Sequence, residues 1–191
     1  SEDGVVTITR ASARSTYPAQ FMLVAAMNPC PCGNYGSRIT PCRCTAQQIQ
    51  RYRNRISGPM LDRIDIHVEM GEVGYNDIAG RSCGEPSSAI RARVNAARAI
   101  QTRRYAGMGI LFNAQLTNRM MNQYCVLTSD AESLMKKAFA ALKLSARAYT
   151  RLLKVSRTIA DLAGSEQIKA EHIAEAIQYR SLESKYWGEI R

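Results

Sequence analysis

The feature that most constrains the fold of this chain is an unbroken apolar run, residues 21–27 (FMLVAAM), which turns sharply polar at Asn28. A short apolar run bounded by proline and glycine is typical of a buried central strand in an α/β sheet. Ligands of such sheets bind just beyond the carboxyl ends of the strands. Asn28 is therefore a candidate ligand-contacting residue. On local sequence alone, the simpler interpretation is that Asn28 starts a turn.

Four of the six cysteines follow this run as two Cys-x-Cys pairs: Cys30, Cys32, Cys42 and Cys44. Clustered thiols in a reducing compartment indicate a metal site before disulfides. Four thiolates suffice for a closed tetrahedral site, so we predict a structural zinc ion in this loop. Two alternatives stay open: four reduced thiols in a loop ordered by its prolines and Gly33, or a disulfide formed on oxidation. The isolated Cys83 and Cys125 are predicted to be packing or surface residues.

The longest apolar run is far too short to span a bilayer, and no basic-then-apolar leader opens the chain. We expect a cytoplasmic protein with no membrane partner.

The net charge of +10 is concentrated in the second half of the chain. Residues 1–80 hold 8 Lys/Arg and 7 Asp/Glu, whereas residues 81–191 hold 18 and 9. No acidic residue lies between Glu85 and Asp130, a stretch that contains several arginines: Arg91, Arg93, Arg98, Arg103, Arg104 and Arg119. A one-sided basic block is expected for a polyanion partner such as DNA. A well-solvated helix surface is the competing interpretation.

Residues 1–80 have the pattern of an α/β region. The β-branched residues 5–10 predict a strand, residues 11–20 a polar connection, and the alternating residues 64–70 a strand with one buried face. Thr45 and Gln48 form a capping box for a helix that runs to about residue 56, and residues 60–63 predict a helical turn. Residues 71–84 are loop-rich and mark the predicted domain boundary.

Residues 85–191 have the pattern of an all-helical domain. We predict helices from residue 86, over 117–124, over 129–142 with a Ser129/Glu132 capping box, over 145–163, and over 170–182. Gly164 is placed to end the fourth of these.

The predicted helix over 145–163 carries Arg147, Lys154 and Arg157 away from its apolar stripe, which includes Leu152, Ile159 and Leu162. Arg157 and Asp161 are spaced to form an ion pair. Arg147 lies in the first turn, where the helix dipole disfavours a cation, and this placement invites a functional explanation.

Several long segments together carry a family resemblance: FMLVAAMNPCPCG, CRC, RYRNRISGPMLDRIDIHVEM and SARAYTRLLKVSRTIADLAG. They resemble the magnesium-chelatase-like AAA+ ATPases of the ComM/YifB competence-protein type, across essentially the whole chain but over only the C-terminal portion of such a protein. The magnesium chelatase ATPase subunit shares a shorter version of the pattern. The resemblance implies an α/β part followed by an all-α part. These would be a partial AAA+ P-loop core with a cysteine-rich loop at 30–44, in residues 1–80, and a helical lid in residues 85–191.

The resemblance also implies a function: an ATP-dependent motor that works as a hexameric ring and moves on DNA as a branch-migration helicase. Asn28 matches sensor 1, which orients the attacking water. Arg63 matches the arginine finger that reaches the neighbouring subunit's nucleotide, and Arg147 matches sensor 2. Without the resemblance, a salt bridge to Asp62 or Asp65 would be the preferred interpretation of Arg63.

The sequence departs from the family pattern in one respect. It contains no G-x-x-x-x-G-K-[ST] motif and no apolar strand that ends in Asp-Glu. ATP and Mg²⁺ would therefore bind only in a longer parent protein, and we predict that this chain alone is no ATPase. Two other functions stay open: a magnesium chelatase ATPase subunit, and a zinc-stabilised nucleic-acid-binding module without ATP chemistry.

Overall fold

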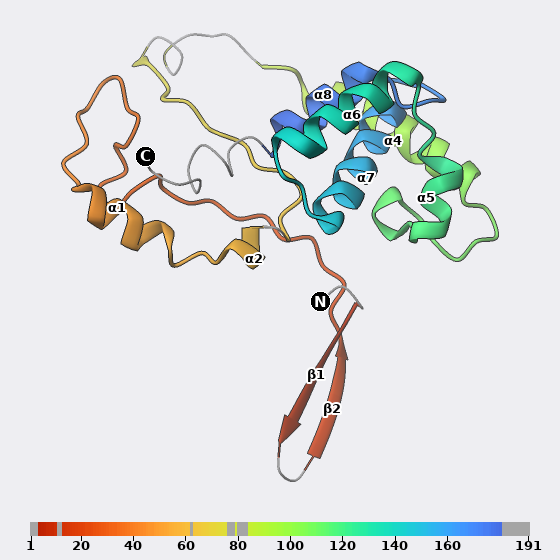
Figure 1. Ribbon diagram of the computed structural model, residues 1–191, viewed down its shortest axis with the longest axis horizontal. Helices are drawn as coiled ribbons and strands as arrows, with labels where there is room; N and C mark the ends of the chain where they lie inside the picture. The colour runs from red at the N-terminus through yellow and green to blue at the C-terminus, as the bar shows by residue number, and fades with distance from the viewer. Residues whose placement is uncertain (1–3, 11–12, 62, 76–78, 80–83, 181–191) are drawn as a thin grey trace. The chain divides into compact units, whose positions relative to one another are not determined.

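A computed structural model describes residues 4–10, 13–61, 63–75, 79 and 84–180 (Figure 1). The chain divides into two compact units, Ser1–Ile49 and Gln50–Arg191. Each unit is described by itself below.

The first unit opens with an antiparallel hairpin of strands β1 (Val5–Arg10) and β2 (Ala13–Pro18). The register pairs Val5 with Pro18 and Arg10 with Ala13. The predicted strand over 5–10 is confirmed, but β2 occupies a stretch that we predicted to be a connection. Both strands are exposed on both faces, so β2 lacks the alternation of apolar and polar residues by which a half-buried strand is recognised.

The prediction of a buried strand over residues 21–27 is wrong. These residues form no strand, and their side chains are exposed, with Met22 and Val24 at 88% and 85%. A central strand needs hydrogen-bonded neighbours at both edges. No strand pairing among the described residues includes this run. The apolar composition of residues 21–27 is thus typical of a central strand, but the described residues provide no sheet for it to join.

Helix α1 (Ala46–Arg53) begins with the predicted capping box. The Thr45 amide donates to Gln48 Oε1 at 2.9 Å, and the Gln48 amide donates to Thr45 Oγ1 at 3.2 Å. The short helix α2 (Gly58–Leu61) follows, two residues earlier than the turn predicted over residues 60–63.

The predicted strand over residues 64–70 is also wrong. Ile66, Val68 and Met70 are exposed rather than buried, and no strand is present there. The segment is held by isolated contacts instead of a ladder: the His67 amide donates to the Tyr179 carbonyl at 2.8 Å. Alternation of apolar residues is necessary for a half-buried strand but does not supply a pairing partner.

The second unit contains the helical region, residues 84–180, with the expected order of helices. They are α4 (Ser87–Arg104), the 3₁₀ turn η1 (Asn113–Gln115), α5 (Asn118–Tyr124), α6 (Ser129–Ala141), α7 (Ala146–Leu162) and α8 (Ala170–Gln178). Helix α7 contacts α4, α5, α8 and η1 and is the central helix of this region. No helix in the described part of the chain is both long and apolar enough to cross a membrane.

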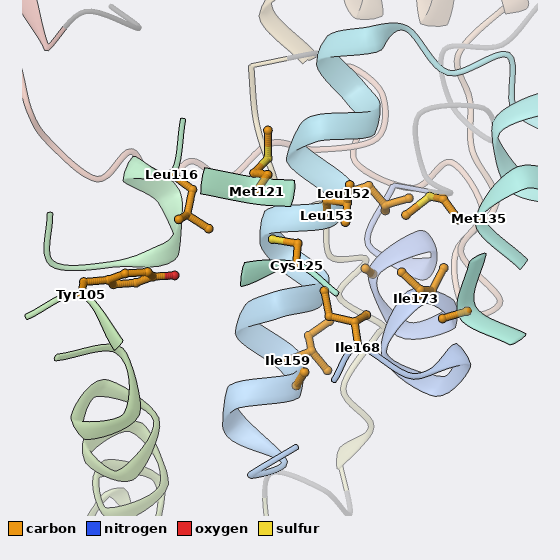
Figure 2. Packing of buried hydrophobic residues seen from close by; sticks show 13 residues of the cluster. Tyr105, Leu116, Met121, Cys125, Met135, Leu152, Leu153, Ile159, Ile168 and Ile173 are labelled. Carbon is orange, nitrogen blue, oxygen red and sulfur yellow. The ribbon is translucent and has the colours of Figure 1, made fainter. Parts of the chain in front are cut away.

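The hydrophobic core lies around α7 (Figure 2). Leu152, Leu153 and Ile159 contribute from α7, and Ile168 and Ile173 from the chain around α8. The predicted stripe on α7 is therefore correct at Leu152 and Ile159, but Leu162 at the end of the helix is 45% exposed.

The helix ends are set by local hydrogen bonds. Ser145 Oγ accepts from the Ala148 amide at 3.1 Å and begins α7 as its N-cap. Gly164, with φ of +66°, ends the same helix, as predicted. The N-cap of α6 is Thr128, whose Oγ1 accepts from the Ala131 amide, so the predicted capping box at Ser129 is wrong by one residue.

Candidate nucleotide-sensing and metal-binding residues

Asn28 is exposed and belongs to the first unit, at the start of the cysteine-rich loop. The Gly33 amide donates to the Cys30 carbonyl at 3.0 Å, which closes a turn directly after it. Gly33 has φ of +82°, and a Cβ at this glycine would lie 4.0 Å from Asn28 Cγ. The Asn28 side chain therefore lies beside this turn.

The structure brings together the four cysteines of the loop. Their sulfur atoms all lie within 4.8 Å of one another. Cys30 Sγ is 3.4 Å from Cys32 Sγ and 3.7 Å from Cys42 Sγ, and Cys32 Sγ is 3.6 Å from Cys42 Sγ. Cys30 is buried, Cys42 and Cys44 are half-buried and Cys32 is exposed.

The surroundings of these thiols shift the pKa values of Cys32 and Cys44 in opposite directions. Backbone N–H groups of Asn34 and Arg43 lower the pKa of Cys32 to about 6, because a hydrogen-bond donor stabilises the thiolate. Burial, and then the neighbouring thiols, raise the pKa of Cys44 to about 12. One thiol of the group is therefore ready to ionise at neutral pH, while a close neighbour keeps its proton.

Arg63 follows α2 and is exposed. Its guanidinium donates to the Pro59 carbonyl at 2.7 Å. Asp65, one of two carboxylates that we considered as its ion-pair partner, pairs instead with Arg151 at 3.3 Å. The other, Asp62, lies outside the described residues.

Arg147 lies in the first turn of α7, two residues after the N-cap, and is exposed. Arg151 lies one turn further along the same helix face. Because Arg151 pairs with Asp65, the helix that carries Arg147 is joined to the segment that carries Arg63. The two candidate nucleotide-contacting arginines and the Arg151–Asp65 ion pair all belong to the second unit.

The arginines predicted to contact DNA have different surroundings on α4. Arg91 and Arg103 are exposed, and the Arg98 guanidinium lies 4.7 Å from the ring centre of Phe112. Arg93 forms an ion pair with Glu85. The Arg104 guanidinium forms an ion pair with Asp161 at 2.5 Å and is mostly buried.

Asp161 is the centre of a buried polar network that the sequence pattern revealed only in part. It accepts from both Arg104 and Arg157, and from Asn113 Nδ2 at 2.8 Å. The predicted Arg157–Asp161 ion pair is confirmed. The expectation that Arg157 projects away from the apolar stripe is wrong, because Arg157 is 1% exposed. Its guanidinium donates to the carbonyls of Glu166 and Ser165 as well.

The pKa of Asp161 lies below its usual range. Burial acts to raise it, but hydrogen bonds from Arg104 and Asn113 and the charges of both arginines outweigh burial. Arg104 and Asn113 could not be recognised as partners from local sequence, because they lie 57 and 48 residues away from Asp161 in the chain.

Both parts of the chain match family profiles of the same protein, a magnesium chelatase subunit. The family profile described as "Magnesium chelatase, subunit ChlI" matches residues 1–78, and that of "Magnesium chelatase, subunit ChlI C-terminal" matches residues 84–180. The competence protein ComM of Haemophilus influenzae is 44% identical over 182 residues. The uncharacterized proteins YifB of Salmonella typhimurium and Escherichia coli are 42% and 41% identical. Each alignment covers 95% of this chain but 35% of the relative, so the chain spans about a third of the length of these relatives.

Proposed function

This chain belongs to the magnesium chelatase subunit ChlI C-terminal family, and on that basis we propose that it is the C-terminal part of an ATP-dependent AAA+ motor. One observation carries the proposal: the two family matches follow one another along the chain, over residues 1–78 and 84–180. The candidate nucleotide-contacting residues are divided between them, with Asn28 and Arg63 in the first match and Arg147 in the second.

Each of the three residues has a proposed role in phosphoryl transfer. Asn28 orients the water that attacks the γ-phosphate, Arg63 reaches the nucleotide of the neighbouring subunit, and Arg147 contacts the nucleotide of its own subunit. Phosphoryl transfer is catalysed mainly by positioning and by positive charge on the phosphoryl oxygens. Arginine suits both tasks because its planar guanidinium stays charged and binds phosphate oxygens in pairs. All three side chains are exposed, as ligand contact requires.

In this proposal the phosphate-binding loop and the magnesium ligand come from another part of a longer protein. The 191-residue sequence contains neither motif. The chain alone should then neither hydrolyse ATP nor bind it tightly. Magnesium-dependent turnover by the pure chain would contradict this.

We further propose that the motor is a homo-oligomer, a hexameric ring, and that its substrate is DNA, on which it acts in branch migration. The similarity to a competence protein and the basic helix α4 support a DNA substrate. A chelatase ATPase subunit that acts on a tetrapyrrole-inserting partner is the second candidate, favoured by the family description. The long cysteine-bearing loop favours the DNA motor over the chelatase.

The test is ATP hydrolysis by the longer, P-loop-bearing protein with single substitutions. Arg63→Ala should lower kcat by roughly 10³-fold or more, the effect expected for loss of an arginine that acts in trans. Arg147→Ala and Asn28→Ala should also lower kcat. Lys137→Ala, which removes an exposed cation of α6, is the matched control and should leave hydrolysis unchanged. Wild-type kcat in all three site variants would refute the assignment of these residues.

A further inference from the structure

The cysteine-rich loop has no part in the proposed nucleotide chemistry. We propose that Cys30, Cys32, Cys42 and Cys44 bind one zinc ion, with all four thiolates as ligands. The inference stands apart from the motor function, because it rests on the geometry of the loop alone.

The spacing of the sulfur atoms matches a zinc site. Four sulfurs at about 2.3 Å from a tetrahedral zinc ion lie about 3.8 Å from one another. The Sγ–Sγ distances of Cys30 to Cys32 and Cys42 are 3.4 and 3.7 Å, and that between Cys32 and Cys42 is 3.6 Å. All four sulfurs converge within 4.8 Å. A movement of Cys44 Sγ by up to about 1 Å would complete the tetrahedron.

The same distances argue against disulfides in this conformation. A disulfide requires sulfurs about 2.05 Å apart, and the four cysteines are unbonded. Cys30, Cys32 and Cys42 form one group with similar Sγ–Sγ distances, rather than one close pair and a separate thiol, and such a group is typical of a shared ion.

The backbone supplies hydrogen bonds that a thiolate ligand needs. The Cys44 amide donates to Cys42 Sγ at 3.5 Å, and amides of Asn34 and Arg43 donate to Cys32. Four thiolates and one divalent cation together carry a net negative charge, and these N–H donors stabilise it. Each Cys-x-Cys pair thus includes a sulfur that accepts an N–H bond from the loop.

Local structure on both sides fixes the two pairs of ligands. The first pair lies on the turn closed by the Gly33 amide and the Cys30 carbonyl. The second pair directly precedes Thr45, which begins α1 with its capping box. The ion would therefore join the turn beside Asn28 to the start of α1, and its role is structural.

Four sulfur ligands select zinc or iron among the common metals, and a closed site without an open position is typical of structural zinc. We expect no catalytic chemistry at the ion, because no coordination position remains for water.

The test is the metal content of the 191-residue chain purified without chelator. Elemental analysis should find about one equivalent of zinc per chain, as for a single four-cysteine site. Cys30→Ser and Cys42→Ser should each lose most of it, whereas Cys125→Ala should keep it, because Cys125 lies in the core of the helical region. Cobalt substitution should give the intense thiolate charge-transfer absorption of a tetrahedral sulfur site.

A second measurement separates metal loss from misfolding. On chelation, hydrogen exchange should rise at the amides of Gly33 and Cys44 and stay unchanged in α7. Less than about a tenth of an equivalent of metal, with four thiols that react freely with a thiol reagent, would overturn the proposal. Stoichiometric iron in place of zinc would overturn the identity of the ion.

Discussion

Asp161 is the central acceptor of the buried polar network in the helical region. Its carboxylate is fully buried and accepts from two guanidinium groups and one amide. Removal of one partner from a buried ion pair leaves an uncompensated charge. Here removal of the carboxylate would leave two arginines, one of them almost entirely buried.

We therefore predict that Asp161→Ala lowers the free energy of unfolding by about 3–5 kcal/mol. Chemical denaturation followed by circular dichroism measures this. The control is Glu132→Ala, which removes an exposed ion pair with Lys136 and should cost less than about 1 kcal/mol. Equal effects of the two substitutions would show that the network contributes no more than a surface pair.

The network also predicts a dependence of stability on pH. Because the pKa of Asp161 is lower in the folded state than in the unfolded state, its contribution is complete above the unfolded value of about 3.9. The contribution is lost as the pH falls below that value and through the folded pKa. Between pH 5 and pH 2, the wild-type chain should lose more unfolding free energy than Asp161→Asn. Parallel pH profiles of the two proteins would contradict the assignment.

For single residues, the sequence predicted side-chain partners correctly where the two partners lie close together in the chain. The Arg157–Asp161 pair follows from helical spacing. The participation of Arg104 depends on the packing of α4 against α7, which no local pattern encodes. The convergence of the four cysteines was predictable because all four lie within one short loop.

At the scale of elements, the helices were predicted well because their caps are local. The error at the start of α6 has a simple cause: Thr128 and Ser129 are adjacent residues that both cap helices well. Strands fared worse, because residues 21–27 and 64–70 carry strand patterns without a pairing partner among the described residues. A strand depends on its neighbours in a way that a capped helix does not.

The corrected cap can be tested by a matched pair of substitutions. Thr128→Ala should lower the unfolding free energy by about 1 kcal/mol, because it leaves the Ala131 amide without its acceptor. Ser129→Ala should be nearly neutral, because alanine is a good helix former at a position inside α6. The reverse order in thermal denaturation would restore the cap to Ser129.

The Arg151–Asp65 ion pair, which joins α7 to the segment that carries Arg63, gives a second prediction at the scale of elements. In the longer protein, Arg151→Ala should reduce kcat without removing any residue proposed to contact nucleotide, because Asp65 would lose its tie to the helix that carries Arg147. Its effect on stability should stay within about 1 kcal/mol, since Asp65 is more than half exposed. Asp65→Ala should produce the same kinetic change, and the double variant no more than either alone. Additive losses would show that the two residues act separately.

At the scale of the whole molecule, the basic charge of the second half predicts DNA binding that weakens steeply as salt rises. Removal of the exposed Arg91 or Arg103 should reduce the slope of log K against log salt by about one each. Lys136→Ala is the control, because Lys136 already pairs with Glu132. Binding that does not respond to salt would contradict the DNA interface.

The family could be recognised from sequence because several of its motifs are long and specific. The arrangement of Asn28 relative to Arg63 and Arg147 could not be predicted, because Asn28 belongs to one unit and the two arginines to the other. The central claim is that Arg63 acts on a nucleotide held by the next subunit.

Subunit mixing in the longer protein tests this claim most directly. One population carries Arg63→Ala, and the other carries a substitution that disables the phosphate-binding loop. Each population alone should be inactive. The account predicts that the mixture regains ATP hydrolysis, because an intact Arg63 from one subunit then reaches an intact nucleotide site in its neighbour. A mixture that forms joint rings yet hydrolyses no more ATP than its separate components would contradict it.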